Sequence, residues 1–137
     1  MKKLLLFAAL SATTFFSSCN NDDDSNTSQS DLLQGTWKIK DEGYVENGKE
    51  ISYNLTSCDL KTTIEFTNDK FVSEFYEGDE KTTCYHSTGK GTWKLEGDKL
   101  ITLSVDGKKS TLPVGKLTKN EFKYYYEDGG DYVIYTK

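Results

Sequence analysis

Short runs of alternating apolar and polar residues follow one another along the chain from about residue 32 onward. In Thr36 to Lys40, Trp37 and Ile39 share one face. A period of two places side chains on one face of a β-strand, so the alternation predicts half-buried strands. Beyond a short helical turn at 31–33, no segment after residue 32 carries a helical stripe. The other shared faces are Ile64 with Phe66; Phe71, Ser73 and Phe75; Trp93 with Leu95; Ile101, Leu103 and Val105; Leu112 with Val114; Phe122, Tyr124 and Tyr126; and Tyr132 with Ile134 or Val133 with Tyr135.

Turn-forming residues separate these runs. They are Asn47-Gly48, Asn68-Asp69, Gly78-Asp79, Gly97-Asp98, Asp106-Gly107 and Asp128-Gly129-Gly130. Such pairs favour tight hairpins, and their regular spacing predicts a meander of roughly eight to ten antiparallel strands. A sheet of that length splits or closes, and closure removes its exposed edges. We therefore expect an all-β, up-and-down antiparallel barrel of about eight strands, with a β-sandwich as the alternative. Pro113 predicts a sheet edge or a strand end.

The first 18 residues have the pattern of a secretory signal peptide. Lys2 and Lys3 give a positive start, Leu4 to Leu10 is apolar, and small residues precede Cys19. The apolar stretch is shorter than the roughly 20 residues that a membrane-spanning helix needs. We expect residues 1–18 to be removed on export.

Phe16-Ser17-Ser18-Cys19 resembles the bacterial lipobox, in which the cysteine thiol is linked to diacylglycerol. Phe16 and Ser18 depart from the commonest form, and the alternative is a plain signal peptide with Cys19 as a free thiol. The acidic run Asp22-Asp23-Asp24 resembles the export signal that sends Bacteroidota lipoproteins to the cell surface; otherwise it is a solvated acidic tether. We expect residues 19–31 to tether the protein to the outer membrane through the lipid on Cys19, at the cell surface rather than the periplasmic face.

Composition narrows the choice of partners. The chain has a formal charge of −5, and removal of Lys2 and Lys3 with the signal peptide would change this to −7. It contains no arginine, the residue best suited to bind phosphate in a bidentate way. An acidic chain without arginine is a poor candidate for binding nucleic acid. Residues 32–137 are expected to form one monomeric domain.

Two cysteines remain once Cys19 is assigned to lipid. Cys58 and Cys84 form an even pair in an exported chain, which predicts a disulfide, with two free thiols as the alternative. His86 is the only histidine, so neither a zinc site nor another metal or cofactor is expected. His86 lies near Cys84, but a disulfide would remove that nucleophile, and no Gly-x-Ser-x-Gly motif is present. We therefore expect no enzymatic activity.

Two motifs carry a resemblance to a known family. Leu33-Gln34-Gly35-Thr36-Trp37 opens the domain, and Gly91-Thr92-Trp93-Lys94-Leu95 echoes it. With Cys58, Thr63 to Phe66, Cys84 and Gly97 to Leu100, in that order, they resemble the lipocalin-like lipoprotein domain of Bacteroidota, over residues 32–137. The resemblance implies a small β-barrel, a lipid anchor, mostly no assigned ligand, and a tryptophan, Trp37, that closes one barrel end.

The predicted meander restricts the disulfide. The strands expected at 60–66 and 80–87, the second of which contains Cys84, would be second neighbours, nearly 10 Å apart at about 4.8 Å per step. A disulfide needs about 4.4–6.8 Å between Cα atoms. Cys58 should therefore lie in the connection at 54–59, which would fold over a barrel end as a lid.

Five aromatic residues are the candidates for a ligand-binding wall: Trp37, Trp93, Phe122, Tyr124 and Tyr126. The alternative is that they fill the core, because an eight-stranded barrel is only just wide enough for side chains or one small ligand. The leading hypothesis is a non-enzymatic binder or carrier of a small hydrophobic or amphipathic ligand, which enters opposite Trp37. The alternative is an accessory or interaction lipoprotein with a filled barrel, which binds a protein or glycan by its outer surface.

Overall fold

The computed structural model describes residues 27–79, 81 and 83–137. The predicted signal peptide and Cys19 lie outside the described residues. The elements, in chain order, are α1 (Gln29–Leu33), β1 (Gly35–Glu46), β2 (Lys49–Ser52), the 3₁₀ helix η1 (Asp59–Lys61), β3 (Thr63–Thr67), β4 (Lys70–Glu77), β5 (Tyr85–Glu96), β6 (Lys99–Ser104), β7 (Lys109–Leu117), β8 (Glu121–Tyr125) and β9 (Asp131–Thr136). Neither helix in this part of the chain is long and apolar enough to cross a membrane.

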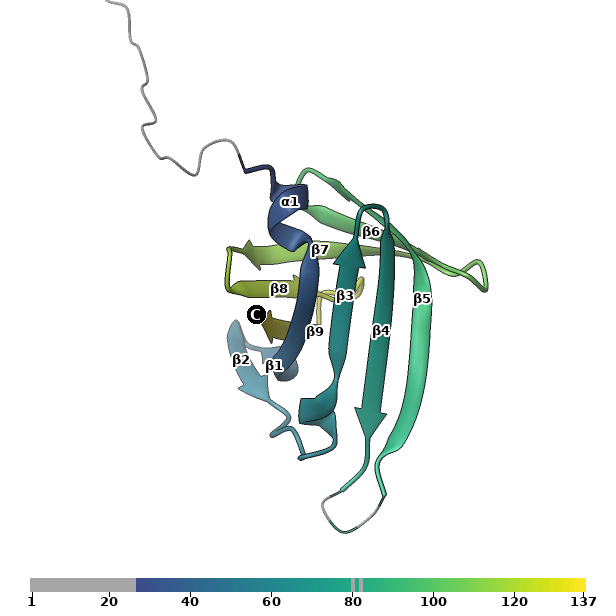
Figure 1. Cartoon of the computed structure of the whole chain (residues 1–137). Helices are drawn as coiled ribbons and strands as arrows, with labels where there is room; N and C mark the ends of the chain where they lie inside the picture. The colour runs from purple at the N-terminus through teal and green to yellow at the C-terminus, as the bar shows by residue number, and fades with distance from the viewer. Residues whose placement is uncertain (1–26, 80, 82) are drawn as a thin grey trace, which may run out of the picture.

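The strands form one antiparallel sheet that closes on itself (Figure 1). From β3 to β9 each strand pairs with the next, β1 pairs with β3, and β1 also pairs with β9 to close the barrel. The short β2 folds back along the end of β1 and stands outside the ring of eight. This confirms the predicted all-β up-and-down barrel of about eight strands, and every predicted turn connects two strands of the sheet.

Strand β1 closes the barrel because it is long enough to pair with three other strands. Residues 35–38 pair with β3, residues 38–44 with β9, and residues 43–46 with β2. Its register against β9 shifts between Ile39 and Asp41, which is a β-bulge with Lys40 as the extra residue. A bulge bends a strand and changes which side chains point inward. Ile39 faces Tyr135, but beyond the bulge Glu42, not Asp41, faces Val133.

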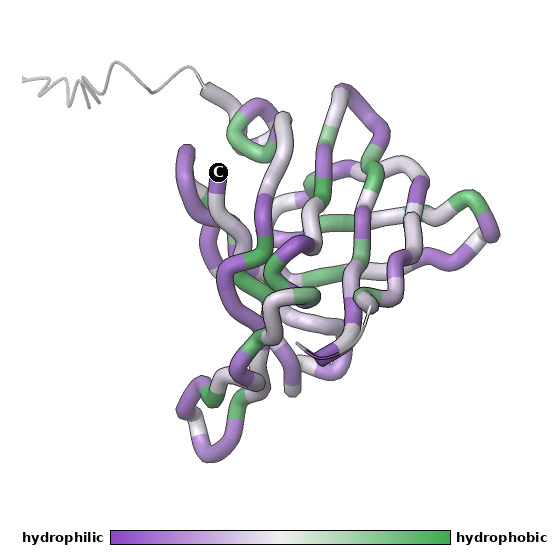
Figure 2. The backbone as a smooth tube through the Cα atoms, turned by 60° about the horizontal axis from the view of Figure 1, so that its bottom comes forward, coloured by the Kyte–Doolittle hydropathy of each residue, from purple (hydrophilic) through white to green (hydrophobic). Residues whose placement is uncertain are grey.

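Hydrophobic and hydrophilic positions alternate along the strands (Figure 2). The alternation buries one face of each strand in a single aromatic and aliphatic core. The members of this core are Leu33, Trp37, Ile39, Ile64, Phe66, Phe71, Trp93, Leu100, Phe122, Tyr124, Val133 and Tyr135. Of the two possibilities for the last strand, Val133 with Tyr135 is therefore the inward pair.

The expectation of a half-buried strand with Ile101, Leu103 and Val105 on its inner face is wrong for β6. Thr102 pairs with the buried Trp93 and therefore faces inward. Its neighbours Ile101 and Leu103 face outward. Leu103 is 47% exposed and Val105 is 83% exposed, whereas Leu100 is buried. Period two correctly predicts that the three share a face, but it does not say which face meets water.

Pro113 is neither at a sheet edge nor at a strand end, contrary to expectation. It lies inside β7, between β6 and β8. The ladder to β6 ends at the Lys99–Pro113 pair, and the ladder to β8 begins at the Val114–Tyr124 pair. A residue without an N–H is tolerated where a strand changes its partner, because little ladder bonding is lost there.

One barrel end is closed by α1. Ser28 and Asp31 cap this helix reciprocally, so it begins earlier than the turn expected at 31–33. Leu33 is fully buried, and its carbonyl oxygen accepts a 2.7 Å hydrogen bond from Nε1 of Trp37. The Lys137 ammonium stands 4.4 Å from the centre of the Trp37 ring. Trp37 therefore closes this end of the barrel, as the family resemblance implies.

Candidate functional site

The end of the barrel opposite α1 is hollow. A cavity of about 460 Å³ opens there, and its walls come from β1, β4, β9 and the two connections that follow β2 and β8. Its lining consists of Ile39, Glu42, Tyr53, Leu55, Asp59, Thr62, Phe75, Tyr76, Glu77, Tyr126, Val133 and Tyr135. Small-molecule sites occupy roughly 300–1,000 Å³, and the mouth of a β-barrel is a usual place for them.

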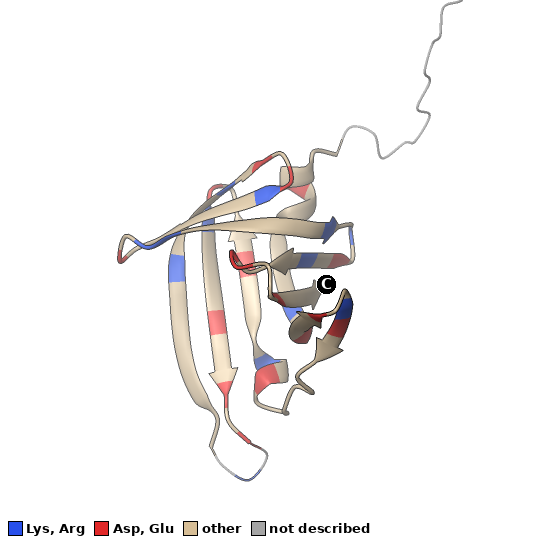
Figure 3. Ribbon diagram, turned by 180° about the vertical axis from the view of Figure 1, so that it is seen from behind, with Lys and Arg blue, Asp and Glu red and all other residues tan. Residues whose placement is uncertain are grey.

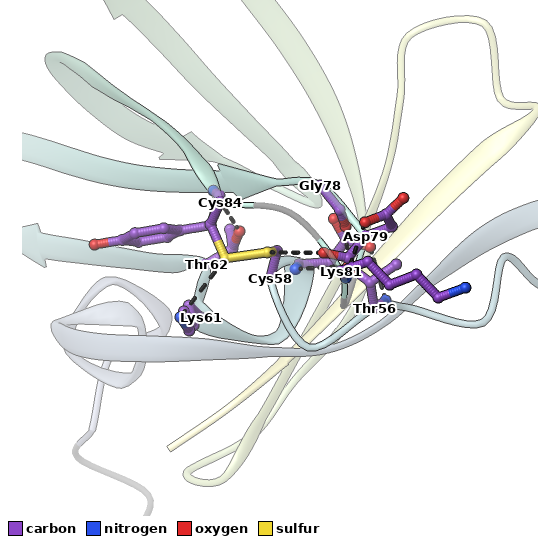
Figure 4. The surroundings of a disulfide bond; sticks show 10 residues. Thr56, Cys58, Lys61, Thr62, Gly78, Asp79, Lys81 and Cys84 are labelled. Carbon is purple, nitrogen blue, oxygen red and sulfur yellow. Dashed lines mark hydrogen bonds between the residues drawn. A yellow bond between two sulfur atoms is a disulfide. The ribbon is translucent and has the colours of Figure 1, made fainter.

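The disulfide holds one wall of this cavity (Figure 4). Cys58 and Cys84 are bonded, with 5.5 Å between their Cα atoms. Cys58 lies immediately before η1, and Cys84 immediately before β5. The pairing and the off-strand location of Cys58 agree with the prediction, whereas Cys84, expected within a strand at 80–87, lies just before β5. The segment from Tyr53 to Thr62 contributes Tyr53, Leu55, Asp59 and Thr62 to the lining, so the connection that was expected to form a lid forms one wall of the cavity.

Hydrogen bonds fix the same wall to the end of β4. The Thr56 hydroxyl donates to the Gly78 carbonyl at 2.7 Å, and the Thr56 N–H donates to the Asp59 carboxylate at 2.8 Å. The backbone N–H of Tyr76 donates to the hydroxyl of the buried Thr62 at 3.1 Å. The bonds to Gly78 and from Tyr76 join the connection after β2 to the end of β4, and the bond to Asp59 holds the connection itself in shape. The wall is therefore held in place before any ligand binds.

Stacked tyrosines form the transition from the solid core to the cavity. Tyr124 and Tyr135 lie nearly parallel, with ring centres 6.1 Å apart, and Tyr126 meets Tyr124 edge-on at 5.7 Å. Burial raises the pKa of all three phenols, so they stay protonated at neutral pH. The hydroxyls of Tyr126 and Tyr135, which line the cavity, can donate to a ligand or a neighbour.

Glu42 is a half-buried carboxyl in this cavity. Burial raises its pKa above the usual range, and the nearby carboxylates of Asp59, Asp131 and Glu77 raise it further. The Tyr126 hydroxyl points at Glu42 from 3.5 Å, a long hydrogen bond that acts in the opposite direction. Glu42 faces inward because of the bulge in β1, which places it opposite Val133.

The five aromatic candidates fall into two groups. Trp37 and Phe122 are fully buried, and Trp93 and Tyr124 nearly so; none of these four lines the cavity. Tyr126 follows the end of β8, is 37% exposed and lines the cavity. The barrel is thus filled around the two tryptophans and hollow beyond the tyrosines, so each of the two alternatives describes one half of it.

Several lining residues were not selected from the sequence. Phe75 and Tyr135 carried a signal, because alternation placed Phe75 on the shared face of its strand and Tyr135 on one of the two faces left open for the last strand. No sequence pattern indicated Glu42 or Asp59. The inward position of Glu42 depends on the bulge in β1, and Asp59 lies in an irregular connection. Tyr53 and Tyr76 are exposed or half-exposed aromatics at strand ends, where the alternation has stopped.

The residues considered for catalysis are engaged elsewhere. The Cys84 sulfur is in the disulfide. His86 lies beside Glu74, with 2.5 Å between Nε2 and Oε2, and its ring stacks on Tyr76 at 4.6 Å. Within the described residues, no group of three or more His, Cys, Asp or Glu side chains is arranged to hold a metal ion.

Comparison with known proteins agrees with the geometry. The family model described as a lipocalin-like domain matches residues 33–124. A lipocalin-like protein from Bacteroides uniformis superposes with a TM-score of 0.55 at 18% identity, covering 77% of this chain and 98% of that protein. An uncharacterized protein from Bacteroides eggerthii gives a TM-score of 0.54 at 17% identity, with 77% and 99% covered. No curated protein matches.

Proposed function

The chain belongs to the lipocalin-like domain family, and from the open end of its barrel we propose that it binds a small hydrophobic or amphipathic ligand without transforming it. The observation that carries this proposal is the cavity of about 460 Å³. A barrel filled along its whole length would have left only the outer surface for binding.

The cavity wall suits an amphipathic molecule. Ile39, Leu55 and Val133 offer an aliphatic surface, while the tyrosines combine apolar rings with hydroxyl groups. Pockets of this size are mostly apolar and use a few polar groups to orient the ligand. The disulfide and the Thr56 bonds hold the wall in its open shape, which lowers the entropy lost on binding.

The absence of a reaction is also part of the proposal. It is supported by the bonded state of Cys84 and by the position of His86 beside Glu74. We propose further that the protein is tethered to the outer membrane, facing the cell surface, through the lipid on Cys19. The support for this tether is the sequence pattern of residues 1–24. A tethered barrel would bind its ligand close to the membrane.

The experiment is titration with a neutral fluorescent amphiphile, N-phenyl-1-naphthylamine, whose emission rises in apolar surroundings. We expect saturable binding to the protein. Leu55→Trp places a large ring inside the cavity and should weaken binding by about tenfold or more, equivalent to at least 1.4 kcal/mol. Leu103→Trp makes the same change on the outer face of β6 and should leave the affinity unchanged.

The same pair of variants tests the alternative, binding through the outer surface. That alternative is favoured by a shallow apolar groove on the outside of β4, β5 and β6, where Val72, Leu103 and Val105 are exposed or half-exposed. If Leu103→Trp weakens probe binding and Leu55→Trp does not, the binding surface is this groove. Absence of saturable binding to the unmodified protein would overturn the cavity proposal.

A further inference from the structure

Three carboxylates line the cavity, and they come from three separate elements. Glu42 projects from β1, Asp59 belongs to η1, and Glu77 ends β4. Figure 3 shows acidic positions on η1 and at the end of β4, at the same end of the barrel. Glu42 is partly buried and feels the repulsion of the other two, together with that of Asp131 on β9.

No cation balances these charges within the described residues. The cavity lining contains no lysine and no histidine, and none of the ion pairs in this part of the chain includes Glu42, Asp59 or Glu77. The Asp59 carboxylate accepts a backbone N–H, and Glu42 has only the long contact with Tyr126. A carboxylate removed from water without a cationic partner is unfavourable, and a positively charged ligand would relieve that cost.

Aromatic rings stand among the carboxylates. Tyr53, Phe75 and Tyr126 line the same cavity. The face of an aromatic ring attracts a cation within about 6 Å, and this attraction is strongest where water is excluded. Carboxylates and aromatic faces together are therefore suited to an organic cation, whose apolar part can lie against Ile39, Leu55 and Val133.

We infer that the ligand of this cavity is an organic cation with an apolar body, such as an alkylammonium or arylalkylammonium compound. The inference rests on the proposed function and names the class of its ligand. The negative charge of the chain, −5 in total, would favour the approach of such a molecule. A bare metal ion fits less well, since the described residues hold no cluster of three metal-ligating side chains.

The test compares three probes with the same chain length and different charge: octyltrimethylammonium, 1-octanol and octanoate, each below its micelle concentration. Calorimetric titration of the purified protein should show the cation binding about tenfold tighter than the alcohol, and the anion binding more weakly than both. Glu42→Gln keeps the shape of the side chain and removes its charge. It should weaken binding of the cation by about tenfold and leave 1-octanol unchanged.

The matched control is Glu65→Gln. Glu65 is exposed, lies on β3 and does not line the cavity, so this variant loses the same charge without changing the site. Its affinity for the cation should stay within about twofold of that of the unmodified protein. If both variants weaken binding of the cation equally, the preference for a cation comes from the overall charge of the chain and not from the cavity. That result would overturn the inference.

The remaining outcomes separate the inference from the proposed function. If the alcohol and the cation bind with equal affinity, and Leu55→Trp weakens both, the cavity binds ligands but does not select a cation. The inference then fails while the proposed function stands. If none of the three probes nor the fluorescent amphiphile binds, both fail.

Discussion

Two tryptophans in the same local sequence, Gly-Thr-Trp-Lys, have different polar surroundings. Nε1 of Trp37 donates to the carbonyl of Leu33, whereas Nε1 of Trp93 is buried without a partner. Both rings pack against phenylalanines of the core, Trp37 against Phe122 and Trp93 against Phe66. The two indole rings therefore pack in a similar way, but only the N–H of Trp37 has a hydrogen-bond acceptor.

This contrast predicts unequal effects of the same substitution. Trp37→Phe loses ring volume and leaves the Leu33 carbonyl without its indole donor, so the free energy of unfolding should fall by about 2–4 kcal/mol. Trp93→Phe loses the same volume but also removes an unpaired donor, so the loss should be smaller by about 1–3 kcal/mol. Urea unfolding of the two variants measures the difference. Equal losses would show that the hydrogen bond to Leu33 contributes little.

Glu42 predicts a pH-dependent difference in stability. Its pKa is higher in the folded chain than in the unfolded one, so its protonated form favours folding. This contribution is fully present below the unfolded pKa and is lost as the pH rises through the folded pKa. Glu42→Gln should therefore raise the melting temperature at pH 7 and lose this advantage near pH 4, because the native side chain is then also neutral.

Thermal unfolding of the unmodified protein and Glu42→Gln across this pH range gives the measurement. Glu65→Gln is again the control, since an exposed carboxylate outside the cavity should show little change in the difference with pH. A Glu42→Gln variant that is less stable than the unmodified protein at pH 7 would contradict the predicted sign.

At the scale of elements, the connection from Tyr53 to Thr62 depends on the disulfide. The bond joins two cysteines 26 residues apart, and the loop-closure model assigns such a crosslink about 3.5 kcal/mol. The double variant Cys58→Ala with Cys84→Ala should lose about this much unfolding free energy, and its connection should be cut sooner by a protease. The probe should also bind less tightly, because Leu55 and Asp59 belong to this wall.

Chemical denaturation and timed proteolysis measure the two effects separately. The unmodified protein under reducing conditions is the control, and it should behave as the double variant does. Unchanged stability together with unchanged cleavage would mean that the Thr56 hydrogen bonds alone hold the wall.

The elements also show where sequence patterns succeed. Alternation identified the inner faces of β1, β3 and β8 because a strand with one buried face must alternate. It failed for β6, where the outer residues Leu103 and Val105 are as apolar as the inner Leu100. The β1 bulge was invisible because its extra residue, Lys40, is an ordinary polar residue at an ordinary position. A bulge is set by pairing with β9, which lies far away in sequence.

At the scale of the whole molecule, the spacing of the turns predicted most of the strand order, and the length of the meander predicted closure of the sheet. The exception is β2, which stands outside the ring, so that β1 pairs with β3. Neighbouring strands in the meander are neighbours in sequence, so local signals are sufficient for most of the barrel. The cavity is different, because its lining comes from both ends of the chain and from irregular connections. Only Tyr126 among the five aromatic candidates could be placed there, since it continues the inner face of β8 past its end.

The proposed position of the molecule in the cell rests on the lipid expected on Cys19, and this proposal predicts a fractionation result. In a bacterial host that processes lipoproteins, the unmodified protein should sediment with the membranes and carry an N-terminal lipid detectable by mass spectrometry. Cys19→Ala should be exported but remain soluble, because acyl chains provide the membrane affinity. Its barrel should unfold at the same temperature, since Cys19 precedes α1 and takes no part in the disulfide. A Cys19→Ala protein that still sediments with membranes would require another anchor.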